Sequence, residues 1–424
     1  MLFKRAVISS LLFLSSLATL LIFLHTHIRP SDRAQYQKLT KAAAELRNSG
    51  PLERNPTYQT RDFSEKDIWT DEREHFQMNS EYSTLSLKQK KGKTEAIENL
   101  EKLSFFLQNP SCVLRAARGT YEYPSHHFSA TQVECTHELG TLLTGSAIVE
   151  SKGKSLTCKD GVFFKASREG SPLSIQSERA LSPLPSNKRF SFLENQKIEF
   201  FHQVLIHGME EITARGGYAI YNAGSLVLHP EIPKHHCHLE KLGNRIDATE
   251  ITFDLKQERI SCQNPKGLLD LKEQGLFRFS SDKLLWQKQN DLITLNENIT
   301  IEQTDKFLIQ ADLAQLTLQE RKNLKLVEIT NNVRLFSPCI QNKDSFAVAD
   351  KMVLDPQTQT LTLSAESPKR VLFWQEGITL SAPEIRIAKD PITGQELIQG
   401  KGDIHFSFSV EEQNIMNQFI SKYL

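Results

Sequence analysis

From about residue 67 to residue 409 the sequence consists of short runs in which polar and apolar residues alternate. Ile251–Leu255 and Ile404–Phe408 show the alternation, and Asp390–Gly394 is typical of the turns between runs. Alternation places successive side chains on opposite faces of a β-strand. Such runs, about 8–12 residues apart, indicate a sandwich, a barrel or a stacked sheet. We therefore predict an all-β body with no long helix.

The runs belong to an internal repeat, in which a small residue is followed by one or two polar residues and then by an apolar alternation. The repeat begins at Ala248, Ser281, Ala311, Ala349 and Ala382, so that its steps are 33, 30, 38 and 33 residues. A period of about 33 residues predicts a stack of similar β units, each of which completes the core of its neighbour. We expect the small residue where a strand bends or where two sheets approach closely.

The N-terminal segment Ala6–Leu24 contains no charged residue. At ~1.5 Å per residue, a helix of this length nearly spans the ~30 Å of bilayer hydrocarbon. Lys4 and Arg5 precede it, which predicts a cytoplasmic N-terminus and places the rest of the chain across the membrane. We expect residues 1–28 to be an uncleaved anchor. A cleaved signal is the alternative, although the small-residue site Ser16–Ala18 lies inside the apolar run.

The remaining chain divides by composition into four parts. Residues 29–66 are polar and irregular and predict a stalk. Residues 67–185 and 186–409 predict two β-repeat domains, with one extended stack as the alternative. Residues 410–424 predict a C-terminal helix that either covers the last sheet edge or docks a partner. The apolar face of that helix contains Ile415, Met416, Phe419, Ile420 and Tyr423.

Charge and motifs exclude several classes of function. The 51 basic and 51 acidic residues give a formal net charge of zero, which argues against a nucleic-acid partner. His137–Thr141 begins like a zinc-protease motif but lacks its second histidine. We therefore expect no enzyme and no cofactor. The basic run Lys88–Lys93 indicates either a hairpin turn or a contact with anionic phosphate groups.

Four possible metal ligands are adjacent in the sequence at His235–His238. Adjacent residues of a strand point to opposite faces, so two of these side chains at most can share a metal, whereas a structural zinc site usually needs four ligands. We expect no metal site. The cysteines are either buried as small apolar residues or paired in disulfides, which an extracytoplasmic space permits. They are Cys112, Cys135, Cys158, Cys237, Cys262 and Cys339.

Three pairs of segments carry a family resemblance: Leu292–Ile301 with Ala311–Leu318, Val327–Leu335 with Ala349–Leu354, and Leu361–Phe373 with Ala382–Ile387. Together with the anchor they resemble the periplasmic lipopolysaccharide-transport proteins of the LptC, LptA and OstA (LptD N-terminal) type. The resemblance implies an open antiparallel β-jelly roll, or β-taco, with an apolar groove for the acyl chains of lipopolysaccharide. Residues 67–409 are about twice as long as the usual domain of the family, so two jelly rolls are fused or one is extended.

The resemblance also implies a location, partners and a function. The protein would be a single-pass inner-membrane protein with its bulk in the periplasm. It would take up lipopolysaccharide acyl chains in the groove and pass them toward the outer membrane, as part of a bridge of lipopolysaccharide-transport proteins paired edge to edge. Two alternatives remain: a β-repeat scaffold of the envelope that binds no lipid, and an extracytoplasmic enzyme on a β scaffold. Alternation places eight apolar residues toward the groove, or toward an ordinary dry core. They are Ile251, Phe253, Leu284, Leu313, Met352, Leu354, Ile385 and Ile387.

Overall fold

The computed structural model describes most of the chain between residues 34 and 408. The ranges are 34–41, 57–60, 64–70, 74–90, 93–108, 111–123, 125, 127–137, 139–149, 155–166, 173–183, 197–208, 211–222, 224–271, 275–304, 306–319, 323–340, 343–375, 377–389 and 396–408. Within these ranges, no helix has the length and apolar character needed to cross a membrane. The expected anchor Ala6–Leu24 and the expected C-terminal helix 410–424 lie outside them.

The chain forms two compact units. The first contains Met1–Tyr58 and Ser86–Glu95, and the second contains Gln59–Leu85 and Ala96–Leu424. In the first unit, residues 34–41 form a helix. There the Thr40 hydroxyl donates to the Tyr36 carbonyl oxygen over 2.7 Å. The second unit contains nearly all of the β structure and every feature discussed below.

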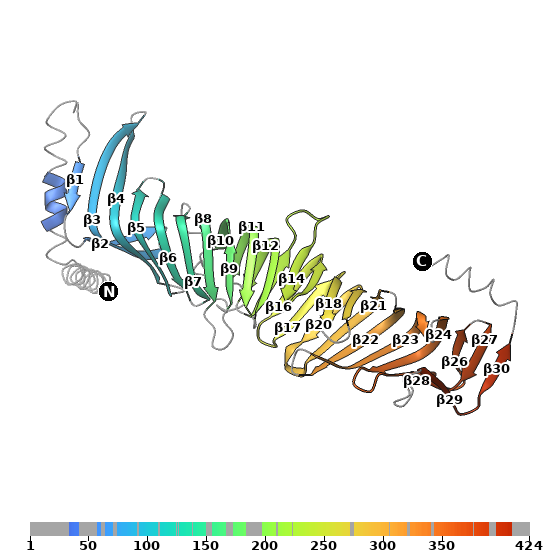
Figure 1. The fold of residues 1–424 in the computed structure, drawn as a ribbon. Coiled ribbons are helices and arrows are strands. Elements are labelled where there is room, and N and C mark those ends of the chain that lie inside the picture. The colour runs from blue at the N-terminus through green and yellow to red at the C-terminus, as the bar shows by residue number, and fades with distance from the viewer. Residues whose placement is uncertain are drawn as a thin grey trace, which may run out of the picture. The chain divides into compact units, whose positions relative to one another are not determined.

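The described strands join into one 30-stranded sheet. The strands up to residue 222 are β1 (Thr57–Thr60), β2 (Ser64–Thr70), β3 (Glu74–Lys90), β4 (Lys93–Gln108), β5 (Ser111–Glu122), β6 (His127–His137), β7 (Gly140–Val149), β8 (Ser155–Ala166), β9 (Ser174–Ser177), β10 (Arg179–Pro183), β11 (Lys197–Gly208) and β12 (Ile212–Asn222). From β4 onward each long strand pairs antiparallel with the next one along the chain. Figure 1 shows this order from blue to green.

Strand pairing does not stop at the domain boundaries that the sequence suggested. β9 and β10 each pair with β8 on one side and with β11 on the other. The sheet therefore continues from β8 through β9 and β10 to β11, on both sides of the expected boundary, and Ala96–Leu424 forms part of a single unit. β1 and β2 also begin within residues 29–66, where we expected a stalk, because alternation is hard to read in strands this short.

After β12 the sheet separates into two ladders, here called arm 1 and arm 2. Arm 1 contains β13 (Ser225–His229), β16 (Glu250–Asp254), β17 (Arg259–Gln263) and β20 (Lys283–Gln287). Arm 2 contains β14 (Cys237–Lys241), β15 (Asn244–Ala248), β18 (Lys266–Leu271) and β19 (Gly275–Ser280). A short 3-10 turn, Lys288–Asn290, follows β20. One strand of arm 1 and one strand of arm 2 together form a bent unit that crosses the whole sheet, here called a rung.

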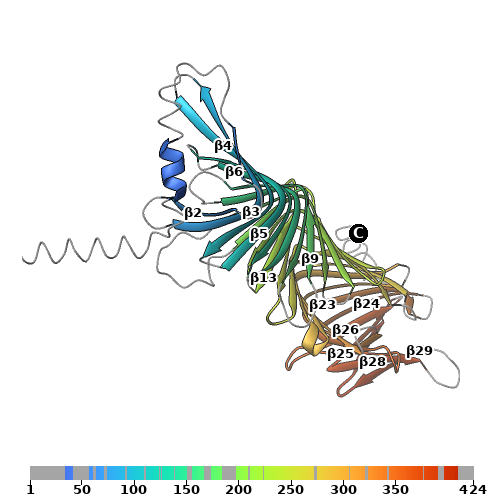
Figure 2. The same ribbon diagram turned by 90° about the vertical axis from the view of Figure 1, so that its left-hand side faces the viewer.

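The next four strands each cross both arms: β21 (Leu292–Gln303), β22 (Phe307–Gln319), β23 (Asn323–Ile340) and β24 (Lys343–Asp355). β21 shows this directly, because it pairs with β20 of arm 1 and with β19 of arm 2. Arm 1 ends with β25 (Thr360–Ser364), β28 (Glu384–Lys389) and β29 (Glu396–Lys401). Arm 2 ends with β26 (Val371–Gln375), β27 (Ile378–Ala382) and β30 (His405–Phe408). Figure 2 shows these last strands from the side.

The small residues of the repeat lie where the rungs bend, as the sequence predicted. Ala248 ends β15 and Ala382 ends β27, while Ser281 separates β19 from β20. Ala311 and Ala349 flank register shifts in the long strands. At such a bend the inner side has room for a small side chain only, which explains the choice of alanine and serine.

On the outer side of the bends, polar residues join neighbouring rungs. Asn298 donates to Asp282 over 2.7 Å, and Asn332 donates to Asp312 over 2.5 Å. Both asparagines have positive φ values, 49° and 56°. Asparagine tolerates this left-handed conformation better than most residues do. It therefore suits the position at which a partner strand of the repeat bends.

Candidate functional site

The inward faces of the two arms enclose an apolar cavity of about 50 Å³. All sixteen residues that line it are apolar, and both arms contribute to it. From arm 1 these are Leu284, Ile293, Leu295, Leu316, Leu324, Val327, Ile329, Met352 and Leu354. From arm 2 they are Ile246, Leu269, Phe277, Phe279, Ile301, Phe307 and Ile309.

Alternation within the strands produces this wall. In β19 Phe277 and Phe279 are buried while Arg278 between them is exposed, and Phe277 lies 5.9 Å from Phe307 between ring centroids. Gly267 makes room for the second ring, because a Cβ atom there would lie 2.1 Å from Phe279 Cε1. Close packing of this kind leaves no volume for a side chain, so the glycine positions a phenylalanine of the cavity wall.

The eight residues predicted to face inward fall into three groups. Leu284, Met352 and Leu354 line the cavity. Ile251, Phe253, Ile385 and Ile387 are buried in the same apolar core but are not among the lining residues. Leu313 belongs to neither group.

The inward orientation expected of Leu313 is wrong. It is half-buried and pairs with Asn296 and Thr330, whereas the neighbouring Ala314 is fully buried. The bend inserts one extra residue, so the inward position lies three residues after the small residue. Ala248 and Ile251 show this spacing, and Ala311 and Ala314 keep it. Counting three residues from Ala311, rather than taking the nearest leucine, would have identified the correct position.

Sequence reasoning also missed the wall that arm 2 contributes. The missed residues lie in strand segments that precede a small residue of the repeat or follow the bend of its partner strand. They are Phe277, Phe279, Ile301, Phe307 and Ile309. Their signal was the same alternation, in Phe277-Arg278-Phe279 and Phe307-Leu308-Ile309. The repeat pattern identifies the strand that follows each small residue, but it does not identify the strand that precedes it.

The cavity is suited to hydrocarbon and to no polar group. Apolar cavities in proteins stay dry and accept apolar ligands, and each buried CH₂ group contributes ~0.8 kcal/mol. Since the free volume is only about 50 Å³, a long acyl chain fits only if the two arms separate. The arms are joined through the bends, and the cavity lies between their two walls.

The polar residues near His235–His238 form an ion-pair cluster on the outer face of arm 2. His238 Nδ1 lies 2.5 Å from Asp247 Oδ1, and Arg245 Nε donates to the same oxygen over 2.9 Å. Partial burial raises the pKa of Asp247, but the hydrogen bonds from His238 and Arg245 outweigh it and lower the pKa overall. In the part of the chain that is described, no three His, Cys, Asp or Glu side chains are grouped to hold a metal.

Four of the six cysteines are described with their side chains, and all four are buried thiols: Cys135, Cys158, Cys237 and Cys262. Burial raises the pKa of Cys237 and of Cys262 to about 12. Protonated thiols at neutral pH are poor nucleophiles, so these two act as small core residues. The side chains of Cys112 and Cys339 lie outside the description.

Together the bent rungs, the two arms and the enclosed cavity define an all-β protein with an apolar interior between antiparallel ladders. No family model and no curated protein matches the sequence. Among solved structures the chain is similar to LptH of Pseudomonas aeruginosa, the LptA-homologous periplasmic component of the lipopolysaccharide transport device. The identity is 12%, the TM-score is 0.28, and the match covers 33% of this chain and 99% of that chain.

Proposed function

We propose that this protein binds the acyl chains of lipopolysaccharide between its two arms and passes them toward the outer membrane. The observation that carries the proposal is the cavity, because all sixteen lining residues are apolar and they come from both arms. No catalytic group, cofactor or metal takes part, since removal of hydrocarbon from water supplies the binding free energy.

The proposed architecture is an extended, open β-jelly roll. Its last strands, β29 and β30, pair on one side with β28 and β27, and no described strand covers their other side. An uncovered edge can accept a strand of another protein through main-chain hydrogen bonds. In this proposal the edge joins the next lipopolysaccharide-transport protein and thereby extends the bridge across the periplasm.

The proposed location is the inner membrane. Ala6–Leu24 would cross the membrane once and hold the β body in the periplasm. Protease accessibility of the body in intact spheroplasts tests this topology. Digestion of the body from the periplasmic side is expected, and full protection would contradict it.

Photo-crosslinking in native membranes tests lipid binding. The probe replaces Met352 or Phe279 of the cavity wall, and matched controls place it at the adjacent Val353 and Arg278, which alternation directs outward. We expect lipopolysaccharide adducts at the two wall positions and at neither control. If no wall position of a folded protein yields an adduct, the transport proposal fails.

The envelope scaffold that binds no lipid remains the second candidate. The small free volume of the cavity favours it, because a scaffold needs only a packed core. The same experiment separates the two functions, since a scaffold gives no lipid adduct while the β body stays folded.

A further inference from the structure

The last rung of the sheet is built differently from the rungs before it. It consists of β29 and β30, joined by a bend at residues 402–404, where Gly402 has a φ of 92°. In the described chain this rung has a neighbouring rung on one side only. A rung with half of the usual pairing loses half of the backbone hydrogen bonds that hold other strands in place.

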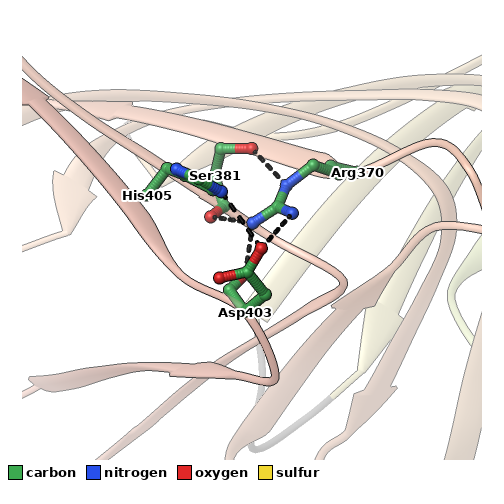
Figure 3. A network of polar contacts seen from close by, with 4 residues as sticks. All are labelled: Arg370, Ser381, Asp403 and His405. Carbon is green, nitrogen blue, oxygen red and sulfur yellow. Dashed lines mark hydrogen bonds and ion pairs between the residues drawn. The ribbon is translucent and has the colours of Figure 1, made fainter.

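Arg370 connects the last rung to the two rungs before it. It stands just before β26, and its Nε donates to Ser381 Oγ over 3.0 Å while its Nη2 donates to the Ser381 carbonyl oxygen over 3.1 Å. Nη2 also donates to the carbonyl oxygen of Asp403. Nη1 lies 3.4 Å from Asp403 Oδ2. Figure 3 shows the guanidinium between Ser381 and Asp403.

These contacts join three successive rungs. Arg370 belongs to the rung of β25 and β26, Ser381 to the rung of β28 and β27, and Asp403 to the last rung. The bends described earlier use a shorter connection, in which one asparagine reaches the aspartate of the adjacent rung. The five donors of an arginine, held in one plane, suit a connection to several acceptors at once.

The bend of the last rung is itself ordered by charge. His405 Nε2 lies 3.1 Å from Asp403 Oδ2. The hydrogen bond from His405, aided by Arg370, lowers the pKa of Asp403. The carboxylate therefore stays ionised at neutral pH and keeps the guanidinium of Arg370 and the imidazole of His405 at the bend.

We propose that Arg370 is a positioning residue that holds the last rung bent and in register, ready to pair with the edge of another β protein. The inference rests on the proposed edge pairing, and it identifies what prepares that edge. A strand that is ordered before binding avoids part of the entropic cost of association.

The last rung also defines what the partner must offer. Phe406 pairs with the buried Leu380 and so lies on the inward face, yet 63% of its surface is exposed. A partner that completes the core must cover this ring with an apolar residue. The matching surface is therefore a bent edge rung with an apolar inner face, as at the end of another two-armed sheet.

Amide hydrogen exchange of the purified full chain tests the role of Arg370. The variants are Arg370→Gln, Arg370→Lys, and Arg386→Gln as a control that removes an exposed arginine of β28. In Arg370→Gln we expect the amides of residues 397–408 to exchange roughly ten- to a hundredfold faster, the range set by loss of hydrogen bonds from a charged donor. Residues 250–263 should be unchanged, Arg370→Lys should be intermediate, and the control should match the wild type.

The inference is overturned if Arg370→Gln leaves the exchange of the last rung unchanged, or if exchange rises equally throughout the sheet. Asp403→Asn is the second variant and should speed exchange of the same residues to a smaller extent, because the backbone acceptor remains. Hydrogen exchange is measured without lipid, so a negative result there is distinct from the absence of a lipid adduct at Met352. Unchanged exchange contradicts the positioning role of Arg370 alone, whereas a missing adduct contradicts transport alone.

Discussion

The interior of the second unit differs between its first strands and its later strands. Between β4 and β12 it is filled by aromatic rings: Phe105 stacks on Phe128 at 5.2 Å, and Phe164 lies 5.7 Å from Phe200 and 5.0 Å from Tyr221. Between β15 and β24 aliphatic side chains and three phenylalanines, Phe277, Phe279 and Phe307, line the apolar cavity. Both regions have the same antiparallel rungs and the same alternation. The two regions therefore differ in how completely their inward side chains fill the interior.

A buried glutamate is a second difference between the two regions. Glu98 of β4 is fully buried, and the hydroxyls of Ser83 and Tyr123 donate to its two oxygens, the latter over 2.6 Å. Burial raises the pKa of Tyr123 to about 12, so its hydroxyl remains a donor. A polar network inside the first region disfavours hydrocarbon there, which restricts the proposed lipid site to the later strands.

The largest expected effect comes from emptying the filled region. Phe164→Ala removes a fully buried ring and should lower the free energy of unfolding by about 3–5 kcal/mol, the usual cost of such a truncation. Urea unfolding of the full chain measures it. A loss below about 1 kcal/mol would mean that the first region is as loosely packed as the second.

A smaller effect is expected from the buried network. Tyr123→Phe removes one hydrogen bond to the Glu98 carboxylate and should cost about 1–3 kcal/mol. The same unfolding measurement applies, with the exposed Tyr82→Phe as control. Equal losses of unfolding free energy in both variants would show that the hydrogen bond to Glu98 does not stabilise the first region.

One substitution made in both regions compares them directly. Leu142→Phe overfills the space beside Phe164, its cross-strand partner, and should cost about 1–3 kcal/mol. Leu316→Phe enters the cavity and should cost less, while lowering the lipopolysaccharide adduct at Met352 severalfold. Unfolding and crosslinking of both variants provide the test. If Leu316→Phe is the more destabilising of the two, the cavity is not usable space.

The smallest effect is expected at the bends, which the two regions share. The hydrogen bond from Lys369, with one from the Glu366 backbone, lowers the pKa of Asp350 below its ordinary value of 3.8. Its contribution to stability is thus present above about pH 4 and is lost as the pH falls through the lowered pKa.

Urea midpoints of Asp350→Asn and the wild type at pH 7, 5 and 3 measure this contribution. The two proteins should differ slightly at pH 7 and at pH 5 and converge at pH 3. The exposed Asp270→Asn serves as control and should match the wild type at each pH. A difference that persists at pH 3 would show that the charge of Asp350 is not the cause.

Much of the fold could be predicted because it depends on local patterns. Alternation predicted the strands, and the repeat predicted the bends at Ala248, Ser281 and Ala382. The inward orientation of Ile251, Phe253 and Met352 followed from the same rule. The error at Leu313 arose because a bend shifts the alternation by one residue, and that shift depends on how two rungs meet across the bend.

The sequence by itself determined that the chain forms bent β rungs, because strand periodicity and small residues at bends are properties of neighbouring positions. Only the tertiary structure decided which inward residues fill the interior and which enclose a cavity. That outcome depends on side chains brought together from different arms, such as Phe279 of arm 2 and Met352 of arm 1, which line the same cavity. It likewise decided that Arg370 holds the last rung, because Arg370 and Asp403 are 33 residues apart in the sequence and meet only when three rungs stack.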